Sequence, residues 1–205
     1  MAKKNRLKKD SGTTGRKKSS SKTSNKKPIL SDRRVRRLSG LFLFFVGIYF
    51  LISFVSFLFT WKEDQSLLSQ NWWVVLRDGT FEAENWLGPL GAMISHVFVY
   101  EWFGIVSFLF VFLIFLYGFK VLFKKSPMPL GKTTLAALAA LIIFSPILAF
   151  LFEQPDLRIL GGRFGYQVNF SLYGKVGVIG TGFLLLFAGA GYVALLTDSG
   201  QENDV

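Results

Sequence analysis

Four long apolar runs, separated by more polar segments, organise this sequence. They cover residues 39–60, 102–123, 133–152 and 176–197, and their only charged residue is Lys120, close to the end of the second run. An apolar run of about 18 residues or more is long enough to cross a bilayer as a helix. The pattern therefore predicts an all-α membrane protein with four transmembrane helices, connected by loops at 61–101, 124–132 and 153–175.

Basic residues cluster on two of the segments that flank the runs, and this clustering predicts an orientation. Residues 1–38 contain 15 Lys and Arg but two acidic residues, and residues 120–132 contain four Lys and no acidic residue. The 61–101 loop has two basic and six acidic residues. Because basic residues beside membrane helices stay in the cytoplasm, we expect both termini and the 124–132 loop to be cytoplasmic. The 61–101 and 153–175 loops then lie outside.

The N-terminal segment, residues 1–34, is rich in Lys and Ser and too polar to bury a core. We predict a disordered basic cytoplasmic tail, then a membrane domain over residues 35–197 and a cytoplasmic C-terminal stub over residues 198–205. The tail either fixes the topology and binds anionic headgroups, or binds nucleic acid or a cytoplasmic protein. A cleaved signal peptide is not expected, because the first apolar run is too long and starts too late.

The 61–101 loop is long and carries five aromatic residues between Trp61 and Trp86. Tryptophan favours the membrane–water interface, so we expect this loop to lie against the membrane. Pro89 suits the first turn of a helix, and Leu90, Ile94, Val97 and Phe98 follow at helical spacing. Residues 88–100 are therefore predicted to form a short amphipathic helix in the interface, and Gly104 to let the chain bend into the second span.

Candidate catalytic or metal-binding chemistry is sparse. The chain has no Cys and one His, His96, so we predict no metal site and no cofactor. His96 is either structural, a proton relay with Glu101, or a partner contact. Polar side chains near the span centres are few: Ser53, Ser56, Ser107, Ser145 and Thr181. We expect no enzyme active site, and the alternative, a small multi-pass transporter, channel or membrane-embedded enzyme, would need polar groups along a path.

Glycines gather around the fourth run and predict close helix packing. Small residues three or four positions apart let two membrane helices approach each other closely. Gly161, Gly162 and Gly165 also permit backbone conformations that other residues avoid. The predicted packing glycines are Gly161, Gly162, Gly165, Gly174, Gly177 and Gly180.

Two stretches of the sequence, residues 85–104 and 161–177, together resemble parts of the N-terminal four-transmembrane domain of the FtsK/SpoIIIE DNA translocase family. The stretch from Asn85 to Ser95 is similar to the family pattern N-x-x-G-x-x-G-A-x-x-[ST], and Phe98, Phe103 and Gly104 follow it as in the family. The glycines of 161–177 resemble the family's approach to its fourth span. The resemblance runs from about Val35 to Leu196. It suggests an outer-loop contact motif of Asn85, Gly88, Gly91, Ala92, Ser95, His96, Phe98 and Gly104.

This resemblance implies a role as well as a fold. It implies a bacterial inner-membrane anchor and oligomerisation domain at the division septum, acting in cell division and chromosome segregation. The implied partners are the lipid bilayer, further copies of the chain and septal cell-division proteins. The 205 residues contain no Walker motif, so DNA is expected to be a partner only through a motor that this chain lacks. The chain is then expected to be either a truncated member of the family or a free-standing anchor domain.

Overall fold

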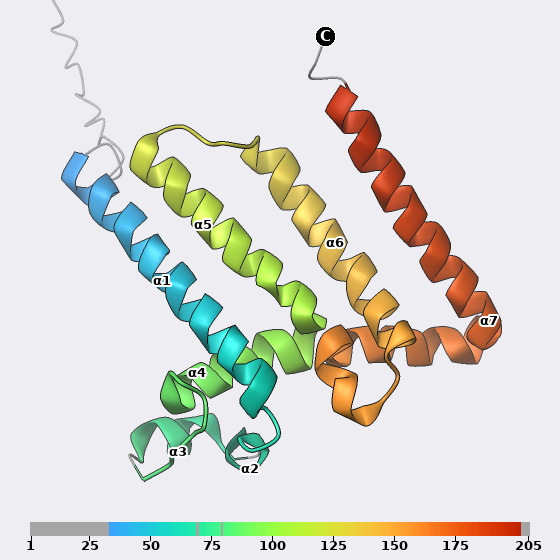
Figure 1. The fold of residues 1–205 in the computed structure, drawn as a ribbon, viewed down its shortest axis with the longest axis horizontal. Coiled ribbons are helices and arrows are strands. Elements are labelled where there is room, and N and C mark those ends of the chain that lie inside the picture. Colours follow the sequence, from blue (N-terminus) through green and yellow to red (C-terminus); the bar gives the residue numbers. More distant parts are fainter. Residues whose placement is uncertain (1–32, 69, 79, 202–205) are drawn as a thin grey trace, which may run out of the picture.

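The computed structural model describes residues 33–68, 70–78 and 80–201. The predicted tail, apart from its last two residues, lies outside the described residues. Four helical segments are long and apolar enough to cross a membrane, and the described part of the chain contains no strand. The predicted fold class, an all-α membrane protein with four spans, is therefore confirmed (Figure 1).

Three of the spans are simple helices. They are α1 (Arg33–Thr60), α5 (Phe108–Phe123) and α6 (Leu130–Leu151). Helix α1 begins six residues before the apolar run, so its first turns carry the arginines of the basic flank. Long basic side chains can extend from such a position to the headgroups while their stems cover apolar surface.

The fourth span is the last part of a longer, bent helix. Helix α7 (Arg158–Gln201) is interrupted at Gly162 (φ 64°, ψ 167°) and Gly177 (φ 71°, ψ 174°). Both conformations are closed to residues with a Cβ. Residues 163–176, here called the α7 crossbar, run across the ends of the other helices, and residues 178–201, the α7 span, run alongside α6 (Figure 1).

A second segment crosses the helix ends in the same way. Helix α4 (Gly88–Ser95) continues into the wider π-helical segment η2 (His96–Phe103), and we call the two together the α4 crossbar. Trp102 leaves helical geometry, and Gly104 (φ 67°, ψ −148°) turns the chain into η3 (Gly104–Ser107) and then α5. The predicted helix at 88–100 is therefore present and reaches Phe103.

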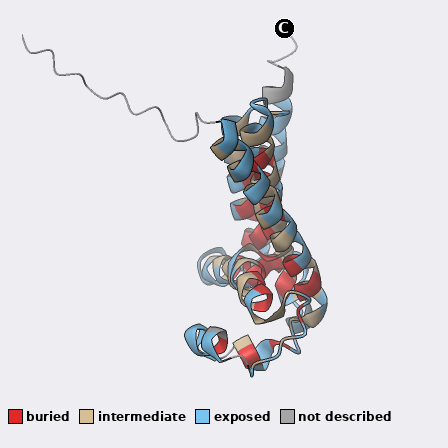
Figure 2. Cartoon of the chain, turned by 90° about the vertical axis from the view of Figure 1, so that its left-hand side faces the viewer, coloured by how far each residue is buried: buried red, intermediate tan, exposed pale blue. Residues whose placement is uncertain are grey.

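The four spans stand side by side in a single layer rather than in a bundle (Figure 1), and Figure 2 shows this layer from its edge. Helix α1 packs on α5 and α6 packs on α7, while α5 and α6 touch only lightly. Glycine permits the close approach of α1 and α5: a Cβ at Gly47 would lie 2.9 Å from the Phe115 ring. The chain thus forms two helical hairpins.

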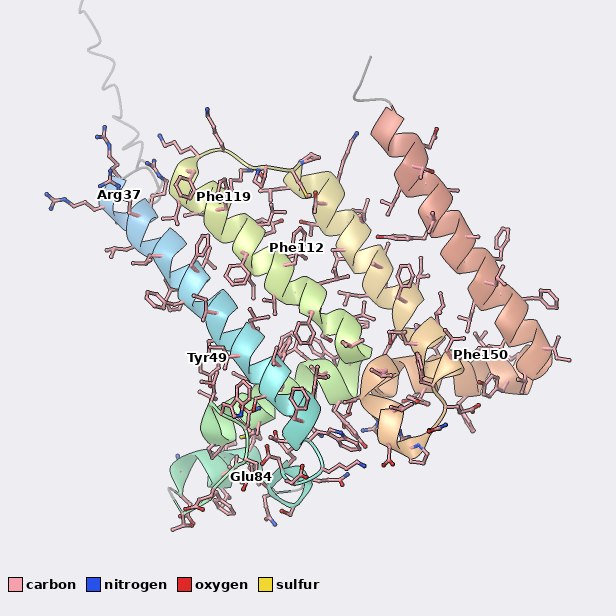
Figure 3. All side chains as sticks on the ribbon, in the orientation of Figure 1. Arg37, Tyr49, Glu84, Phe112, Phe119 and Phe150 are labelled. Carbon is pink, nitrogen blue, oxygen red and sulfur yellow. The ribbon has the colours of Figure 1, made fainter. Side chains whose placement is uncertain are left out.

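We call the structure at one end of the layer the platform. It consists of the two crossbars, α2 (Gln65–Leu68), α3 (Trp72–Arg77), η4 (Pro155–Leu157) and the loops that join them. The largest buried apolar cluster lies where α1, α5, the α4 crossbar and the start of α7 meet, and consists of Phe54, Phe57, Val99, Val111 and Ile159. Arg37 lies at the opposite, basic end, and Glu84 lies in the platform (Figure 3). The spans expose large apolar side chains, such as Phe183 and Phe187, as expected for helices surrounded by lipid.

Candidate functional site

The α4 crossbar is held on α1 by a buried hydrogen-bond network around Ser53. The Ser53 hydroxyl donates to the Gly91 carbonyl at 2.7 Å and lies 2.6 Å from the Ser95 hydroxyl. Because the single Ser53 proton is used for Gly91, Ser95 is the donor to Ser53. Asn85 Nδ2 donates to the Ser53 carbonyl at 3.1 Å. The network satisfies these polar groups where neither lipid nor water reaches them.

Small residues make this network possible. A Cβ at Gly91 would lie 2.5 Å from Asn85 Oδ1 and 3.2 Å from Ser53 Oγ. Gly91 and Ser95 face α1 and are buried, and Ala92 is buried against Leu67 and Val75. Leu90 and Val97 are exposed. Helix α4 therefore turns its small residues to the protein, while Leu90 and Val97 point away from it. Membrane helices commonly divide small and large residues in this way.

The loop that leads to the α4 crossbar folds back on the end of α1. Asp64, 2% exposed, accepts the Glu84 amide at 2.7 Å and the Thr60 hydroxyl at 3.2 Å. The Trp86 amide donates to Ser56 Oγ at 2.9 Å. Sequence reasoning missed these contacts, although Ser53 and Ser56 share one face of α1 at helical spacing and could have suggested a buried polar contact there.

Helix α3 presents an exposed aromatic pair on the platform. Asn71 caps the helix by accepting the Trp73 amide at 3.0 Å. The rings of Trp72 and Trp73 stack with their centroids 4.1 Å apart, and the two residues are 51% and 57% exposed. After the helix, the Thr80 hydroxyl and amide donate to Asp78 Oδ1, and these bonds lower the pKa of this exposed carboxyl.

The residues of the predicted outer-loop contact motif lie mostly inside the protein, and their contact with a partner stays a prediction. None of its eight residues is exposed. Asn85, Gly91, Ala92, Ser95 and Gly104 are buried, while Gly88, His96 and Phe98 are half-buried. The buried residues fix the α4 crossbar against the spans and cannot present their side chains to a partner. Three tryptophans at this end of the molecule are exposed instead: Trp72, Trp73 and Trp86, the last of them 67% exposed.

His96 lies in an aromatic cluster. Its ring stacks on Tyr100 at 5.0 Å between centroids and meets the edge of Phe57 at 6.3 Å. The Glu101 carboxylate pairs with Arg163 at 2.8 Å. A structural role for His96 fits this packing. Glu101, the predicted partner in a proton relay, forms its ion pair with Arg163 instead. The described residues contain no group of three potential metal ligands.

The α7 crossbar is held on α6 by the same kind of contacts. The Ser145 hydroxyl donates to the Gly161 carbonyl at 2.6 Å, and Asn169 Nδ2 donates to the Pro146 carbonyl at 3.0 Å. A Cβ at Gly165 would lie 2.5 Å from the Ser145 carbonyl oxygen. A serine near the platform end of a span and a Gly-rich crossbar therefore form the junction in both hairpins.

The two crossbars share one sequence spacing, which reveals an internal repeat. Gly88, Gly91 and Ser95 have counterparts at the same spacing in Gly162, Gly165 and Asn169. Each crossbar is bounded by two positive-φ glycines: Gly88 (67°) and Gly104 (67°) in one, Gly162 (64°) and Gly177 (71°) in the other. Each half of the domain is thus a span, a crossbar and a second span. The spacing G-x-x-G-x-x-x-[SN] was the available signal, and sequence reasoning missed it.

The two halves meet where the backbones at Gly104 and Gly162 cross. A Cβ at Gly104 would lie 2.1 Å from the Leu160 carbonyl oxygen, and one at Gly162 would lie 2.3 Å from the Trp102 carbonyl oxygen. Such distances exclude any side chain. The Glu101–Arg163 ion pair lies beside this crossing.

The predicted packing glycines divide into two groups. Gly161 and Gly165 contact α6, and Gly162 lies at the crossing. A Cβ at Gly174 or Gly177 would meet nothing within 4 Å, and one at Gly180 would meet only Val176 of its own helix. These last three do not pack on another described helix of this chain, so their packing against a second copy remains a prediction. Gly182 and Gly189 contact α6 instead, at Phe150 and Ile147.

All five polar residues predicted near the span centres bond to main-chain groups. Ser53 and Ser56 bond to Gly91 and Trp86, and Ser107, Ser145 and Thr181 donate to the carbonyls of Phe98, Gly161 and Gly177. These bonds hold the platform and its bends. The transporter or channel alternative therefore loses the polar side chains that would have lined a path.

Residues 32–200 match a family model described as the 4TM region of DNA translocase FtsK/SpoIIIE. The match covers all four spans and both crossbars. No curated protein and no solved structure matches the chain.

Proposed function

Because the chain belongs to the family of the 4TM region of the DNA translocases FtsK and SpoIIIE, we propose that it anchors such a translocase at the bacterial division septum. The matched region is a membrane domain and not the motor. In this proposal the domain is in the inner membrane with both termini in the cytoplasm. It oligomerises with further copies and serves cell division and chromosome segregation, and DNA is handled only by a motor outside these residues.

The distribution of charge along the spans supports the proposed orientation. The basic end carries Arg33, Arg34, Arg36 and Arg37 on α1, Lys124 and Lys125 between α5 and α6, and Lys132 in the first turn of α6. The platform carries the acidic residues of the 61–101 loop, including Glu84 (Figure 3). Since basic flanks remain cytoplasmic, the platform faces outward. The start of α1 and the end of α7 lie at the same end (Figure 1).

The exposed aromatic residues of the platform support contact with septal proteins. Trp72, Trp73 and Trp86 are more than half exposed. Trp72 and Trp73 lie on α3, and Trp86 lies in the loop before α4. Tryptophan is enriched where protein surfaces bind one another, and also at the membrane interface. We assign the partner contact to these residues in place of the buried motif. Oligomerisation is assigned to Gly174, which is exposed, to Gly180, which is half-buried, and to the α7 span.

Localisation in dividing cells tests the proposal. A fluorescent fusion of the whole chain should gather at mid-cell, and the Trp72→Ala/Trp73→Ala variant should remain in the membrane but lose that enrichment. Phe187→Ala, which changes an exposed span residue, is the matched control and should still gather at mid-cell. Uniform membrane fluorescence of the unaltered chain would rule out septal anchoring.

Cysteine accessibility tests the orientation, and the absence of native Cys gives a clean background. Ser95 is unsuitable for this purpose because it is buried. A cysteine at Glu82, which is exposed in the platform loop, should react with an impermeant thiol reagent in intact cells. A cysteine at Met128, 48% exposed at the basic end, should react only after lysis. The reverse pattern would overturn the orientation.

A further inference from the structure

A cavity of about 320 Å³ opens at the start of α7, on the platform. Its lining includes Glu153, Arg158, Arg163, Tyr166, Asn169 and Phe170. The volume lies in the range of small-ligand sites. Nothing in the proposed anchoring role uses this cavity.

Two guanidinium groups line the cavity and keep free hydrogen-bond donors. Arg158 lies over the Tyr166 ring at 5.5 Å and forms no ion pair with a carboxylate of the described residues. Arg163 uses one nitrogen, Nη1, for Glu101. Since each guanidinium has five N–H donors in a planar fork, most of them remain available. Paired arginines of this kind recognise phosphate oxygens.

A buried acceptor in the same lining lacks a donor. Asn169 is 2% exposed, and its Nδ2 donates to the Pro146 carbonyl. That bond fixes the orientation of the amide, because a carbonyl can only accept. The Asn169 Oδ1 is left without a partner, and a buried unpaired acceptor is costly. With the Glu153 carboxylate nearby in the lining, the cavity favours a ligand that also supplies an N–H or O–H donor.

The position of the cavity selects a lipid as the source of these groups. It lies on the α7 crossbar, beside the last turns of α6, and Phe170 in its lining is 80% exposed. We propose that the cavity binds the headgroup of a phospholipid from the leaflet on the platform side. The phosphate lies between Arg158 and Arg163, a headgroup ammonium or hydroxyl donates to Asn169 and Glu153, and an acyl chain runs beside Phe170. Guanidinium groups bind phosphate oxygens in this way.

Lipid retention tests this site independently of septal localisation. The whole chain is purified in detergent, incubated with phosphatidylethanolamine, phosphatidylglycerol or phosphatidylcholine, and bound lipid is counted by native mass spectrometry. The first two lipids have N–H or O–H donors in the headgroup, and phosphatidylcholine has none. We expect them to be retained about tenfold better, corresponding to about one good hydrogen bond to a charged or buried acceptor. Equal retention of all three would overturn the donor assignment.

Variants locate the bound lipid. Arg158→Gln should lower phosphatidylethanolamine retention about tenfold, and Arg158→Lys, which keeps the charge without the fork, should fall between. Lys175→Gln removes an exposed cation of the same crossbar that does not line the cavity, and it should retain lipid normally. An unchanged Arg158→Gln protein, or an equal loss in Lys175→Gln, would reject the site. If unfolding of Arg158→Gln obscures the result, Arg158→Lys alone still decides it.

A soluble competitor separates a lipid site from a site for free phosphate. Inorganic phosphate and glycerophosphoethanolamine contain the headgroup chemistry without acyl chains. Neither should displace the lipid at millimolar concentration, because the chain contact beside Phe170 is missing. Displacement by either would show that the cavity takes soluble phosphates, and the lipid assignment would fall.

Discussion

Alanine at Gly162, compared with alanine at Gly177, tests whether the crossing of the two halves stabilises the domain. The two glycines have nearly the same backbone conformation, with φ and ψ of 64° and 167° against 71° and 174°. Forcing a Cβ into this region costs on the order of 1–3 kcal/mol at either position. The backbone strain is therefore matched, and only the surroundings differ.

The surroundings predict a clear difference in stability. A Cβ at Gly162 would lie 2.3 Å from the Trp102 carbonyl oxygen and 2.4 Å from the Gly104 amide nitrogen, whereas one at Gly177 would meet nothing within 4 Å. The atoms at Gly162 belong to the main chain, so a whole crossbar has to move. Such overpacking costs about 1–3 kcal/mol. We expect Gly162→Ala to be destabilised by about 2–6 kcal/mol and Gly177→Ala by about 1–3 kcal/mol.

Reversible unfolding in mixed detergent micelles, followed through the fluorescence of the five tryptophans, gives the two free energies. Gly104→Ala should resemble Gly162→Ala, because its Cβ would lie 2.1 Å from the Leu160 carbonyl oxygen. Equal losses at Gly162 and Gly177 would mean that backbone strain alone matters. That result would refute the argument that the crossing is a tight contact.

Three further substitutions test the remaining contacts. Ser53→Ala removes the buried hydrogen bonds to Gly91 and Ser95. It should lower the unfolding free energy, measured in the same micelle assay, by about 1–3 kcal/mol. The control Ser126→Ala removes an exposed hydrogen bond and should change the unfolding free energy little. Arg163→Gln should cost less than about 1 kcal/mol, since Arg163 is 62% exposed in its ion pair; a larger loss would show that the pair is shielded. Asp64→Asn should loosen the 61–87 loop, detected as faster limited proteolysis there than in α5, because an amide is a weaker acceptor for the Glu84 amide.

The positions of the spans followed from the sequence because a bilayer imposes a length. Each apolar run lies on one of the four long helices, with ends that differ where geometry takes over. The first helix extends back to Arg33 because basic side chains can reach the headgroups. The second run starts at Trp102, whereas α5 starts at Phe108, because Gly104 turns the chain first. Hydropathy contains no information on such turns.

The predicted contact motif falls in the α4 crossbar and the loop before it, but sequence reasoning did not find the direction of its side chains. Small residues such as Gly91 and Ser95 are compatible with an open contact surface and with close internal packing. The choice depended on Ser53, which lies in another run and becomes a partner only in three dimensions. The roles of Gly162 and Gly177 are likewise inaccessible to sequence reasoning, because the sequence gives the glycine but not its φ. The repeat was detectable, yet its polar position changes from Ser95 to Asn169.

The repeat constrains how many spans such a domain can gain or lose without changing the side of its C-terminal end. Each unit crosses the membrane twice, so it returns the chain to the side from which it started, as the common end of α1, the α5–α6 connection and the α7 terminus shows (Figure 1). Removing or adding a whole unit would leave both ends of the domain on one side. Removing a single span would move everything after it to the other side. Changes in the number of spans are therefore tolerated only in pairs, and the repeat supplies the pair as one folded piece.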